Sequence, residues 1–318
     1  MLGHKKVLTT LQTAIKNDNV SHAYIFEGPD GIGRRETALS FASMLMCEVS
    51  DRPCGECKSC QLFAEGSHPD FQEIYLEDKG ISVEDIRNIL EGLVIRPLYS
   101  KYKVIIINNA DSMTVQAQNA LLKSLEEPPS YLVFILTVQS SAAIAQTVRS
   151  RCQRIFFEKM SYEEIMAILE AKYGSRKPEW DFIVSYADGV IGTAISLIDS
   201  PYYLEVRDEV LDAAVQLTTS EDTDIFKVYD VFEKNNDKID FILRVILLFF
   251  RDILVYSQTS DFSILINSDK KDIIVKNKNL SLSKLIKCID AIWAAKRGLE
   301  VNANFQLAIE VMLMKFQF

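Results

Sequence analysis

The clearest chemistry in this sequence lies in a glycine-rich segment, Gly-Pro-Asp-Gly-Ile-Gly-Arg-Arg, that begins at Gly28. A phosphate-binding loop of the form G-x-x-x-x-G-K-[ST] surrounds phosphates with backbone N–H groups, places a lysine on their oxygens and gives Mg²⁺ a hydroxyl ligand. Gly28, Gly31 and Gly33 keep the glycine frame. The lysine position, however, holds Arg34 and the hydroxyl position holds Arg35. Because guanidinium has only donors and a permanent charge, Arg35 is no ligand for Mg²⁺.

Glycines at this spacing are common, and an ordinary turn between a strand and a helix uses glycine for backbone reasons alone. Here the apolar segment 23–26 precedes the loop and a helical pattern over 35–46 follows it. That order of strand, loop and helix favours a genuine but degenerate phosphate loop over the ordinary turn.

A second nucleotide-site motif lacks its chemistry in the same way. The buried strand predicted at 104–107 is followed by Asn108 and Asn109, where acidic residues normally hold Mg²⁺ and polarise the attacking water. Neutral amides hold Mg²⁺ poorly because hard cations favour carboxylate oxygen. Asp111 follows a little later, and its expected role is a turn or a helix N-cap. Two losses in one site argue against catalysis.

The third pattern is a cluster of cysteines. Four of the six cysteines, Cys47, Cys54, Cys57 and Cys60, fall within one short segment. Four thiolates are enough for a closed, tetrahedral Zn²⁺ site of the structural type. An iron–sulfur centre uses similar cysteine spacing, and four free thiols in a surface loop are the plainest alternative. Zinc is favoured, and His68 is a weaker candidate for a ligand.

The first half of the chain alternates short apolar strands with amphipathic helices, which predicts an α/β domain built on a parallel sheet. The predicted strands are 23–26, 71–75, 104–107, 131–136 and 154–157. The predicted helices are 35–46, 83–94 and 114–127, the last of which ends before two prolines.

After Lys159 the strand pattern stops and the sequence is helical almost to its end. Short helices are predicted at 161–172, 178–187 and 193–198, and longer ones follow Pro201. We therefore expect three domains: a sheet domain at 1–159 with a cysteine module at about 47–60, a small three-helix domain at 160–200, and an all-α domain at 201–318.

The composition, 48% hydrophobic and 25% charged, is that of a soluble globular protein. No apolar run approaches the ~18–20 residues needed to cross a bilayer, and no secretory signal opens the chain. We therefore expect a cytoplasmic protein without membrane contact. A net charge of −9 argues against a protein that coats nucleic acid through its overall field, although a local basic groove is compatible with it.

Taken in order, several segments resemble the clamp-loader branch of the AAA+ ATPases. They are Ser-His-Ala-Tyr at 21–24, the cysteine module, Leu-Leu-Lys-Ser-Leu-Glu-Glu-Pro-Pro at 121–129, and Ser-Arg-Cys at 150–152. These motifs cover about the first half of the chain. The resemblance implies an AAA+, P-loop NTPase-like sheet domain, and the helical second half fits the lid and collar domains of the family by pattern.

Within this family some subunits hydrolyse ATP and others are inactive partners. The losses at both nucleotide motifs match the inactive type, and a lid arginine that senses nucleotide in the motor subunits aligns with Gly192. The resemblance also gives Arg151 a role. In the family, the arginine of Ser-Arg-Cys points across a subunit interface at ATP held by the neighbour, as an arginine finger. We expect no productive binding of ATP and Mg²⁺ and no ATPase activity in the isolated chain.

The resemblance therefore implies a non-hydrolysing stator subunit of the bacterial DNA polymerase III clamp loader, which helps to load the sliding clamp onto primed DNA during replication. The implied partners are the γ/τ and δ subunits, the sliding clamp, and primer–template DNA through the assembled complex. Two alternatives stay open. One is an active ATPase of the γ/τ type, and the other is a zinc-bearing interaction adaptor outside replication.

Overall fold

The computed structural model of the chain describes residues 3–50, 52–75, 80–219 and 224–317. The chain divides into two compact units. Unit 1 contains residues 1–160 together with 190–192, and unit 2 contains 161–189 together with 193–318.

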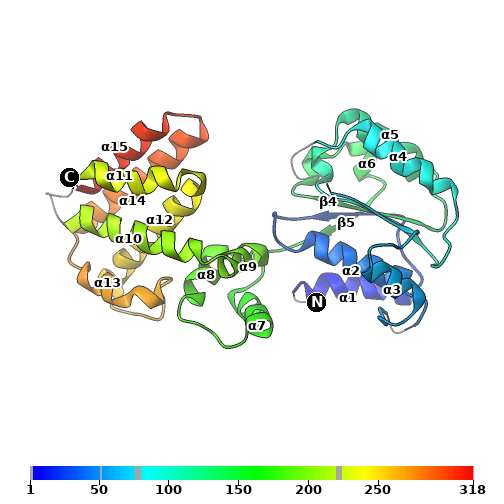
Figure 1. Cartoon of the computed structure of the whole chain (residues 1–318), viewed down its shortest axis with the longest axis horizontal. Coiled ribbons are helices and arrows are strands. Elements are labelled where there is room, and N and C mark those ends of the chain that lie inside the picture. The colour runs from blue at the N-terminus through cyan, green and yellow to red at the C-terminus, as the bar shows by residue number, and fades with distance from the viewer. Residues whose placement is uncertain (1–2, 51, 76–79, 220–223, 318) are drawn as a thin grey trace. The chain divides into compact units, whose positions relative to one another are not determined.

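Unit 1 is built on a five-stranded sheet in which every pairing between neighbours is parallel (Figure 1). The strands are β1 (Ala23–Glu27), β2 (Phe71–Ile74), β3 (Lys103–Ile107), β4 (Leu132–Val138) and β5 (Gln153–Phe156), in the spatial order β2-β3-β4-β1-β5. All five predicted strands are confirmed, with shifts of at most two residues at their ends.

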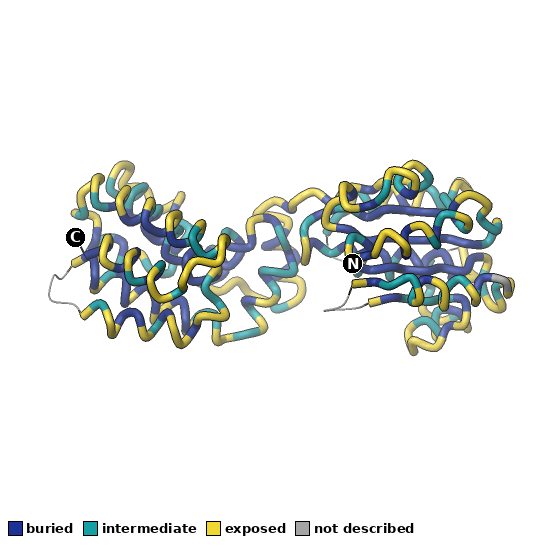
Figure 2. Tube along the Cα trace, turned by 90° about the horizontal axis from the view of Figure 1, so that it is seen from above, coloured by how far each residue is buried: buried dark blue, intermediate teal, exposed yellow. Residues whose placement is uncertain are grey.

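Successive side chains of the central strands pack on opposite faces of the sheet, as the period of two requires. Ala23 and Ile25 of β1 belong to one apolar cluster, which includes buried residues of α4 (Val83–Glu91) and α5 (Val115–Glu126). Tyr24 and Phe26 belong to a second cluster, which includes residues of α1 (Lys5–Lys16) and α2 (Arg34–Met46). Figure 2 shows the central strands as buried. The predicted two-sided sheet is therefore confirmed.

The connections of unit 1 add helices that the sequence pattern did not resolve. They are α1, α3 (Lys58–Ala64) and α6 (Gln146–Arg149). Asp111 lies in a short 3₁₀ turn, which confirms the turn expected of it. The N-cap of α5 is instead Thr114, because its hydroxyl accepts the N–H of Ala117, whereas the carboxylate of Asp111 accepts the N–H of Gln139.

The described part of unit 2 contains helices and no strand. They are α7 (Tyr162–Tyr173), α8 (Trp180–Ala187), α9 (Ile191–Asp199), α10 (Tyr202–Thr219), α11 (Ile225–Lys234), α12 (Ile239–Thr259), α13 (Lys271–Lys276), α14 (Leu282–Glu300) and α15 (Phe305–Gln317), and α9 begins within unit 1. Within this unit, Arg207 of α10 stacks on Phe182 of α8 with its guanidinium carbon 3.9 Å from the ring centre. The helices before and after Pro201 thus share packing, and the three-domain division expected from the sequence stays a prediction. No described helix is long and apolar enough to span a membrane.

Candidate functional site

The glycine loop lies at the carboxyl end of β1 and leads directly into α2. Gly31 and Gly33 have φ angles of 72° and 105°, a left-handed conformation that glycine adopts without a steric penalty. Gly28 has no room for a side chain, because an added Cβ would lie 2.8 Å from the Cβ of Phe157. The loop therefore has the strand–loop–helix setting expected from the sequence, with glycines at positions that their backbone or their neighbours require.

The lysine position of the motif is occupied by a buried arginine. Arg34 is only 5% exposed and pairs with Asp30, with 3.2 Å between Nη2 and Oδ1. Its Nη1 has no hydrogen-bond partner among the described residues, and burial lowers the pKa of the guanidinium. Arg34 and Arg35 line a cavity of about 340 Å³ at the end of the sheet, together with Gly31, Gly33 and Asn109.

The hydroxyl position of the motif is occupied by an arginine that is paired within the chain. Arg35 donates two hydrogen bonds to Glu73 of β2, from Nε to Oε1 at 2.7 Å and from Nη2 to Oε2 at 2.9 Å. Asn108 also donates to Oε1 of Glu73 from its amide, at 2.6 Å. The hydrogen bonds that Arg35 donates to Glu73 raise the pKa of Arg35, and its guanidinium carbon lies 4.9 Å from the ring centre of Tyr75. A fixed cation with its own counter-ion thus stands where the motif would place a Mg²⁺ ligand.

The second motif is integrated into the same network. Asn108 is 2% exposed, and its Oδ1 accepts a hydrogen bond from the hydroxyl of Thr137 at 3.3 Å. Asn109 has a left-handed backbone with φ 49°, and its N–H donates to the same hydroxyl at 3.1 Å. The structure therefore brings together both asparagines and both arginines that the sequence singled out.

Gly192 contacts the loop directly. Its N–H donates to the carbonyl of Gly31 at 2.8 Å, and a Cβ added at Gly192 would lie 2.6 Å from that carbonyl oxygen. The Nε2 atom of His4 lies 2.7 Å from the carbonyl oxygen of Ile32, the next residue of the loop. A side chain at position 192 would therefore collide with the backbone of the phosphate loop.

Sequence reasoning missed two residues of this network, Glu73 and Thr137. Glu73 had a detectable signal, since a carboxylate near the end of a predicted strand is a candidate to face the ends of its neighbours. Its partnership with Arg35, however, depends on β2 lying beside β3, with Glu73 opposite Ile106.

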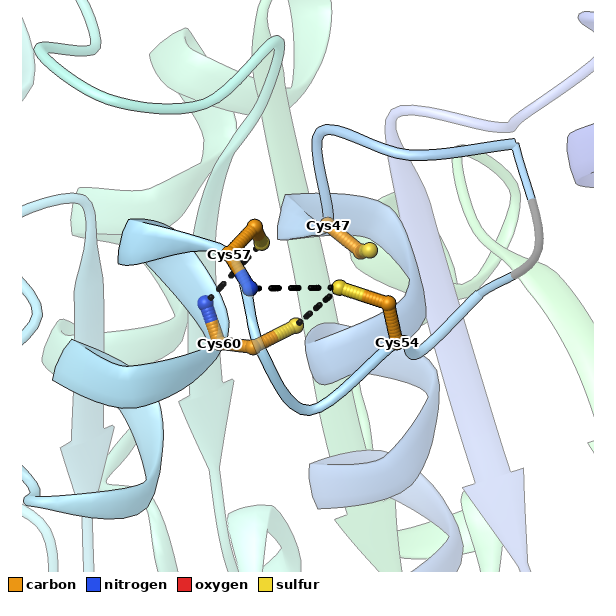
Figure 3. Close-up of side chains that lie close together, drawn as sticks. All are labelled: Cys47, Cys54, Cys57 and Cys60. Atoms are coloured by element: carbon orange, nitrogen blue, oxygen red, sulfur yellow. Dashed lines mark hydrogen bonds between the residues drawn. The ribbon is translucent and has the colours of Figure 1, made fainter.

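The four clustered cysteines converge on one point (Figure 3). One sulfur from each of them lies within 4.8 Å of the other three. The sulfurs of Cys54 and Cys60 are 3.9 Å apart, close to the ~3.8 Å edge of a tetrahedron whose centre is about 2.3 Å from each sulfur. The backbone N–H of Cys57 donates to the sulfur of Cys54 at 3.3 Å. This arrangement fits a tetrahedral metal ion.

The acidities of these thiols are uneven. The N–H groups of Cys57 and Glu56 lower the pKa of Cys54 to about 7, whereas burial raises the pKa of Cys60 to about 12. A bound divalent cation would stabilise all four thiolates, and the donor set is one compatible with zinc.

His68 lies outside the metal cluster. Its Nε2 is 2.7 Å from the hydroxyl of Ser59, and its Nδ1 accepts the N–H of Asp70 at 3.1 Å. Both ring nitrogens are therefore engaged, and the weaker ligand candidate is not part of the set of four cysteines.

Arg151 lies just after α6 with its side chain 34% exposed. Its Nη2 is 2.7 Å from Oε1 of Glu126, at the end of α5, and its Nη1 donates to the carbonyl of Thr147 at 2.7 Å. Arg154, a neighbouring arginine, is bonded instead to Glu27 at 2.9 Å. The structure thus holds Arg151 at the surface of unit 1 in a defined orientation.

Comparison with known families decides which kind of protein carries this site. A family model described as "DNA polymerase III, delta subunit" matches residues 3–161, and one described as "DNA polymerase III, delta subunit, C terminal" matches residues 201–317. The chain belongs to the DNA polymerase III delta subunit family. Membership supports a role in the DNA polymerase III clamp loader.

Individual relatives agree with this membership. The chain is 28% identical to the delta′ subunit of Bacillus subtilis over 317 residues, covering 98% of this chain and 95% of the relative. It is 40% identical to the delta′ subunit of Pseudomonas aeruginosa over 136 residues, 42% of each chain. It is also 29% identical to the tau subunit of B. subtilis over 99% of its own length, but it spans only 60% of that relative.

A solved structure shows the same fold. A DNA polymerase III gamma subunit-related protein from Thermotoga maritima aligns over 98% of both chains with a TM-score of 0.52 at 19% identity. The predicted fold, an AAA+-like parallel sheet domain with a helical C-terminal region, is therefore confirmed.

Proposed function

We propose that this delta-family chain is a non-hydrolysing stator of the clamp loader, of the delta′ type, which helps to load the sliding clamp onto primed DNA. The observation that carries the proposal is the network of Arg35, Glu73 and Asn108. Where a motor subunit needs a hydroxyl and a carboxylate on Mg²⁺, this chain has an arginine already neutralised by the nearest carboxylate. This pairing supports a site that does not hold Mg²⁺ in the position that phosphoryl transfer requires.

We further propose that Arg151 acts on ATP held by a neighbouring subunit. Its orientation by Glu126 and Thr147 supports this role, because a trans-acting finger must reach the transferring phosphoryl group in one geometry. The guanidinium would stabilise the negative charge that develops on the equatorial phosphoryl oxygens.

The test is the DNA- and clamp-stimulated ATPase rate of a loader reconstituted with the Arg151→Ala chain. Arginine fingers contribute about 10³–10⁵ in rate in GTPases, so a loss of at least about tenfold is expected with assembly intact. Arg154→Ala is the matched control, since Arg154 is bonded to Glu27 of the same subunit. An unchanged rate with Arg151→Ala would remove the finger from the proposal.

Exposed apolar side chains in the helical region support the proposal that this chain assembles with γ/τ and δ subunits. The last two long helices of this region expose apolar side chains separated by three, four or seven residues, a spacing that places them along one face of each helix. They are Leu282, Ile286, Trp293, Leu307, Val311 and Met314. Exposed apolar surface of this kind marks a protein interface. Ile286→Asp should abolish co-purification with the γ/τ and δ subunits, whereas Ser283→Asp, an exposed change on the same helix, should not.

We propose zinc as the ion of the cysteine module, in a structural role, because four thiolates leave no open position for substrate. The DNA contacts of this chain would be made through the assembled complex, in the cytoplasm.

The alternative function, an active ATPase of the γ/τ type, requires that the isolated chain bind ATP tightly in the presence of Mg²⁺. Calorimetry measures this binding directly. The reading as an adaptor outside replication requires failure to co-purify with clamp-loader subunits.

A further inference from the structure

Three buried polar residues connect the cysteine module to a distant loop. Ser59 is 1% exposed, His68 is 4% exposed and Asp70 is 1% exposed. Ser59 stands between two of the metal-binding cysteines in α3, and Asp70 comes just before β2. Buried polar groups at this depth need hydrogen-bond partners, and these three find theirs in one another, in backbone groups and, for Asp70, also in the hydroxyl of Ser100.

The first part of the connection ties His68 to the module. The hydroxyl of Ser59 donates to the carbonyl of Met46 at 2.7 Å, and Met46 directly precedes Cys47. Because Nδ1 of His68 accepts the N–H of Asp70, the proton of the neutral ring lies on Nε2 and is donated to Ser59. Burial lowers the pKa of His68, which agrees with a neutral ring. The histidine is a donor to the serine, so this grouping is no catalytic triad.

The second part of the connection ties Asp70 to the loop at 98–100. Its carboxylate accepts the backbone N–H of Leu98 at 2.8 Å, of Tyr99 at 2.9 Å and of Ser100 at 3.2 Å. The side chains of Leu98 and Tyr99 are 68% and 47% exposed. Hydrogen bonds to this carboxylate therefore hold the conformation of the loop more than burial of the loop's own side chains does.

The position of Ser59 depends in turn on the cysteines. Helix α3 has seven residues, and Ser59 is its only buried one. A helix of this length is not stable by itself, and this one buries little apolar surface. Metal–thiolate bonds on both sides of Ser59 are the strongest restraint available to it.

We propose that the metal ion of the cysteine module keeps the exposed loop at 98–100 ordered, through Ser59, His68 and Asp70. The proposal rests on the metal site proposed above. It makes the module a positioning device for a surface segment on another element, and metal loss releases that segment.

Amide hydrogen exchange of the full chain tests the proposal, because the three backbone N–H groups that donate hydrogen bonds to Asp70 report directly on the order of the loop. Metal content is measured separately by elemental analysis before and after chelation. Loss of a buried hydrogen-bond network speeds local exchange by roughly tenfold or more, so the amides of Leu98, Tyr99 and Ser100 should exchange at least that much faster after chelation. Absence of bound metal would refute the site itself. Bound metal with loop exchange unchanged by chelation would refute the coupling alone.

Variants separate the coupling from general unfolding. Ser59→Ala should retain the metal but give the faster loop exchange with or without it, whereas Ser67→Ala, an exposed change just after the same helix, should behave as the unmodified chain does. Asp70→Asn should release the loop without affecting metal content. If Ser59→Ala keeps both the metal and the slow, chelation-sensitive exchange, the path through Ser59 is wrong.

Discussion

Arg35, in the first turn of α2, is held as a fixed cation, and Glu73 of β2 supplies its countercharge. The side chain of Glu73 is 17% exposed and accepts hydrogen bonds from both Arg35 and Asn108. Glu73 is therefore the centre of the network. Replacing Glu73 by glutamine removes the charge and one acceptor oxygen, and it turns an NH2 donor toward a donor of one partner.

Glu73→Gln should therefore lower the free energy of unfolding of unit 1 by about 1–2 kcal/mol, because hydrogen bonds to a charged, partly buried acceptor are lost. Glu91→Gln, at an exposed position at the end of α4, is the isosteric control. Urea unfolding followed by circular dichroism measures the change. Equal stability of the two variants would show that the network adds nothing to folding.

The cysteines divide into two chemical groups. Burial raises the pKa of Cys152 to about 12 and also raises the pKa of Cys288, to about 11, so both are poor nucleophiles at neutral pH. Within the module, the pKa of Cys54 is lowered to about 7, so a bound metal ion would be the main protection of this thiol.

Iodoacetamide labelling at neutral pH should accordingly modify few thiols in the metal-loaded chain and more after chelation, with Cys54, whose pKa is lowered to about 7, reacting fast and Cys60, whose pKa is raised to about 12, reacting slowly. Mass spectrometry of the intact chain and of its peptides gives the count and the sites. Rapid labelling of Cys152 or Cys288 before chelation would contradict the burial seen here.

At the scale of elements, local signals located helix starts well. Ser82 and Ser161 form complete capping boxes with Asp85 and Glu164, at the starts of two helices that the sequence predicted. In each box the serine hydroxyl accepts the N–H of the acidic residue, and the carboxylate accepts the N–H of the serine.

Ser161→Ala should destabilise unit 2 by about 1 kcal/mol, since the cap satisfies a backbone N–H of α7 that is otherwise left without an acceptor. Both tryptophans of the chain, Trp180 and Trp293, lie in unit 2, so their fluorescence reports this unit during unfolding. Ser175→Ala, in the loop after α7, should leave the transition in place. A shift of the same size in that control would assign the effect to something other than the cap.

At the scale of the whole molecule, unit 2 contains a buried arginine that is paired with a carboxylate. Arg207 is 1% exposed, donates to both carboxylate oxygens of Asp269 at 2.7 and 2.8 Å, and donates to Asn267 at 2.7 Å. Breaking a buried ion pair by removing one partner leaves the other charge uncompensated.

Arg207→Ala should therefore destabilise unit 2 by about 3–5 kcal/mol and move the tryptophan transition to lower urea. Arg244→Ala is the control, because Arg244 is 39% exposed and lies 3.9 Å from Asp188. The Glu73→Gln change in unit 1 should leave the tryptophan signal unmoved. A tryptophan transition that follows Glu73 as strongly as Arg207 would show that the two units unfold together.

The sequence by itself determined the chemistry that is local in the chain. The glycine frame, the arginines in place of lysine and hydroxyl, the asparagines after β3 and the four clustered cysteines are all set by residue type and short spacing. Strand positions followed as well, because runs of apolar, β-branched residues bury both faces of a parallel sheet.

Only the tertiary structure decided which of these groups are partners. Glu73 meets Arg35 because β2 pairs with β3, Glu126 meets Arg151 because α5 and α6 pack together, and His68 meets Ser59 because α3 folds back beside β2. Such contacts join residues far apart in the chain, and sheet order and helix packing rather than local propensity select them. The physical reason is that a hydrogen bond depends on distances of a few tenths of an ångström, which only the packed core imposes.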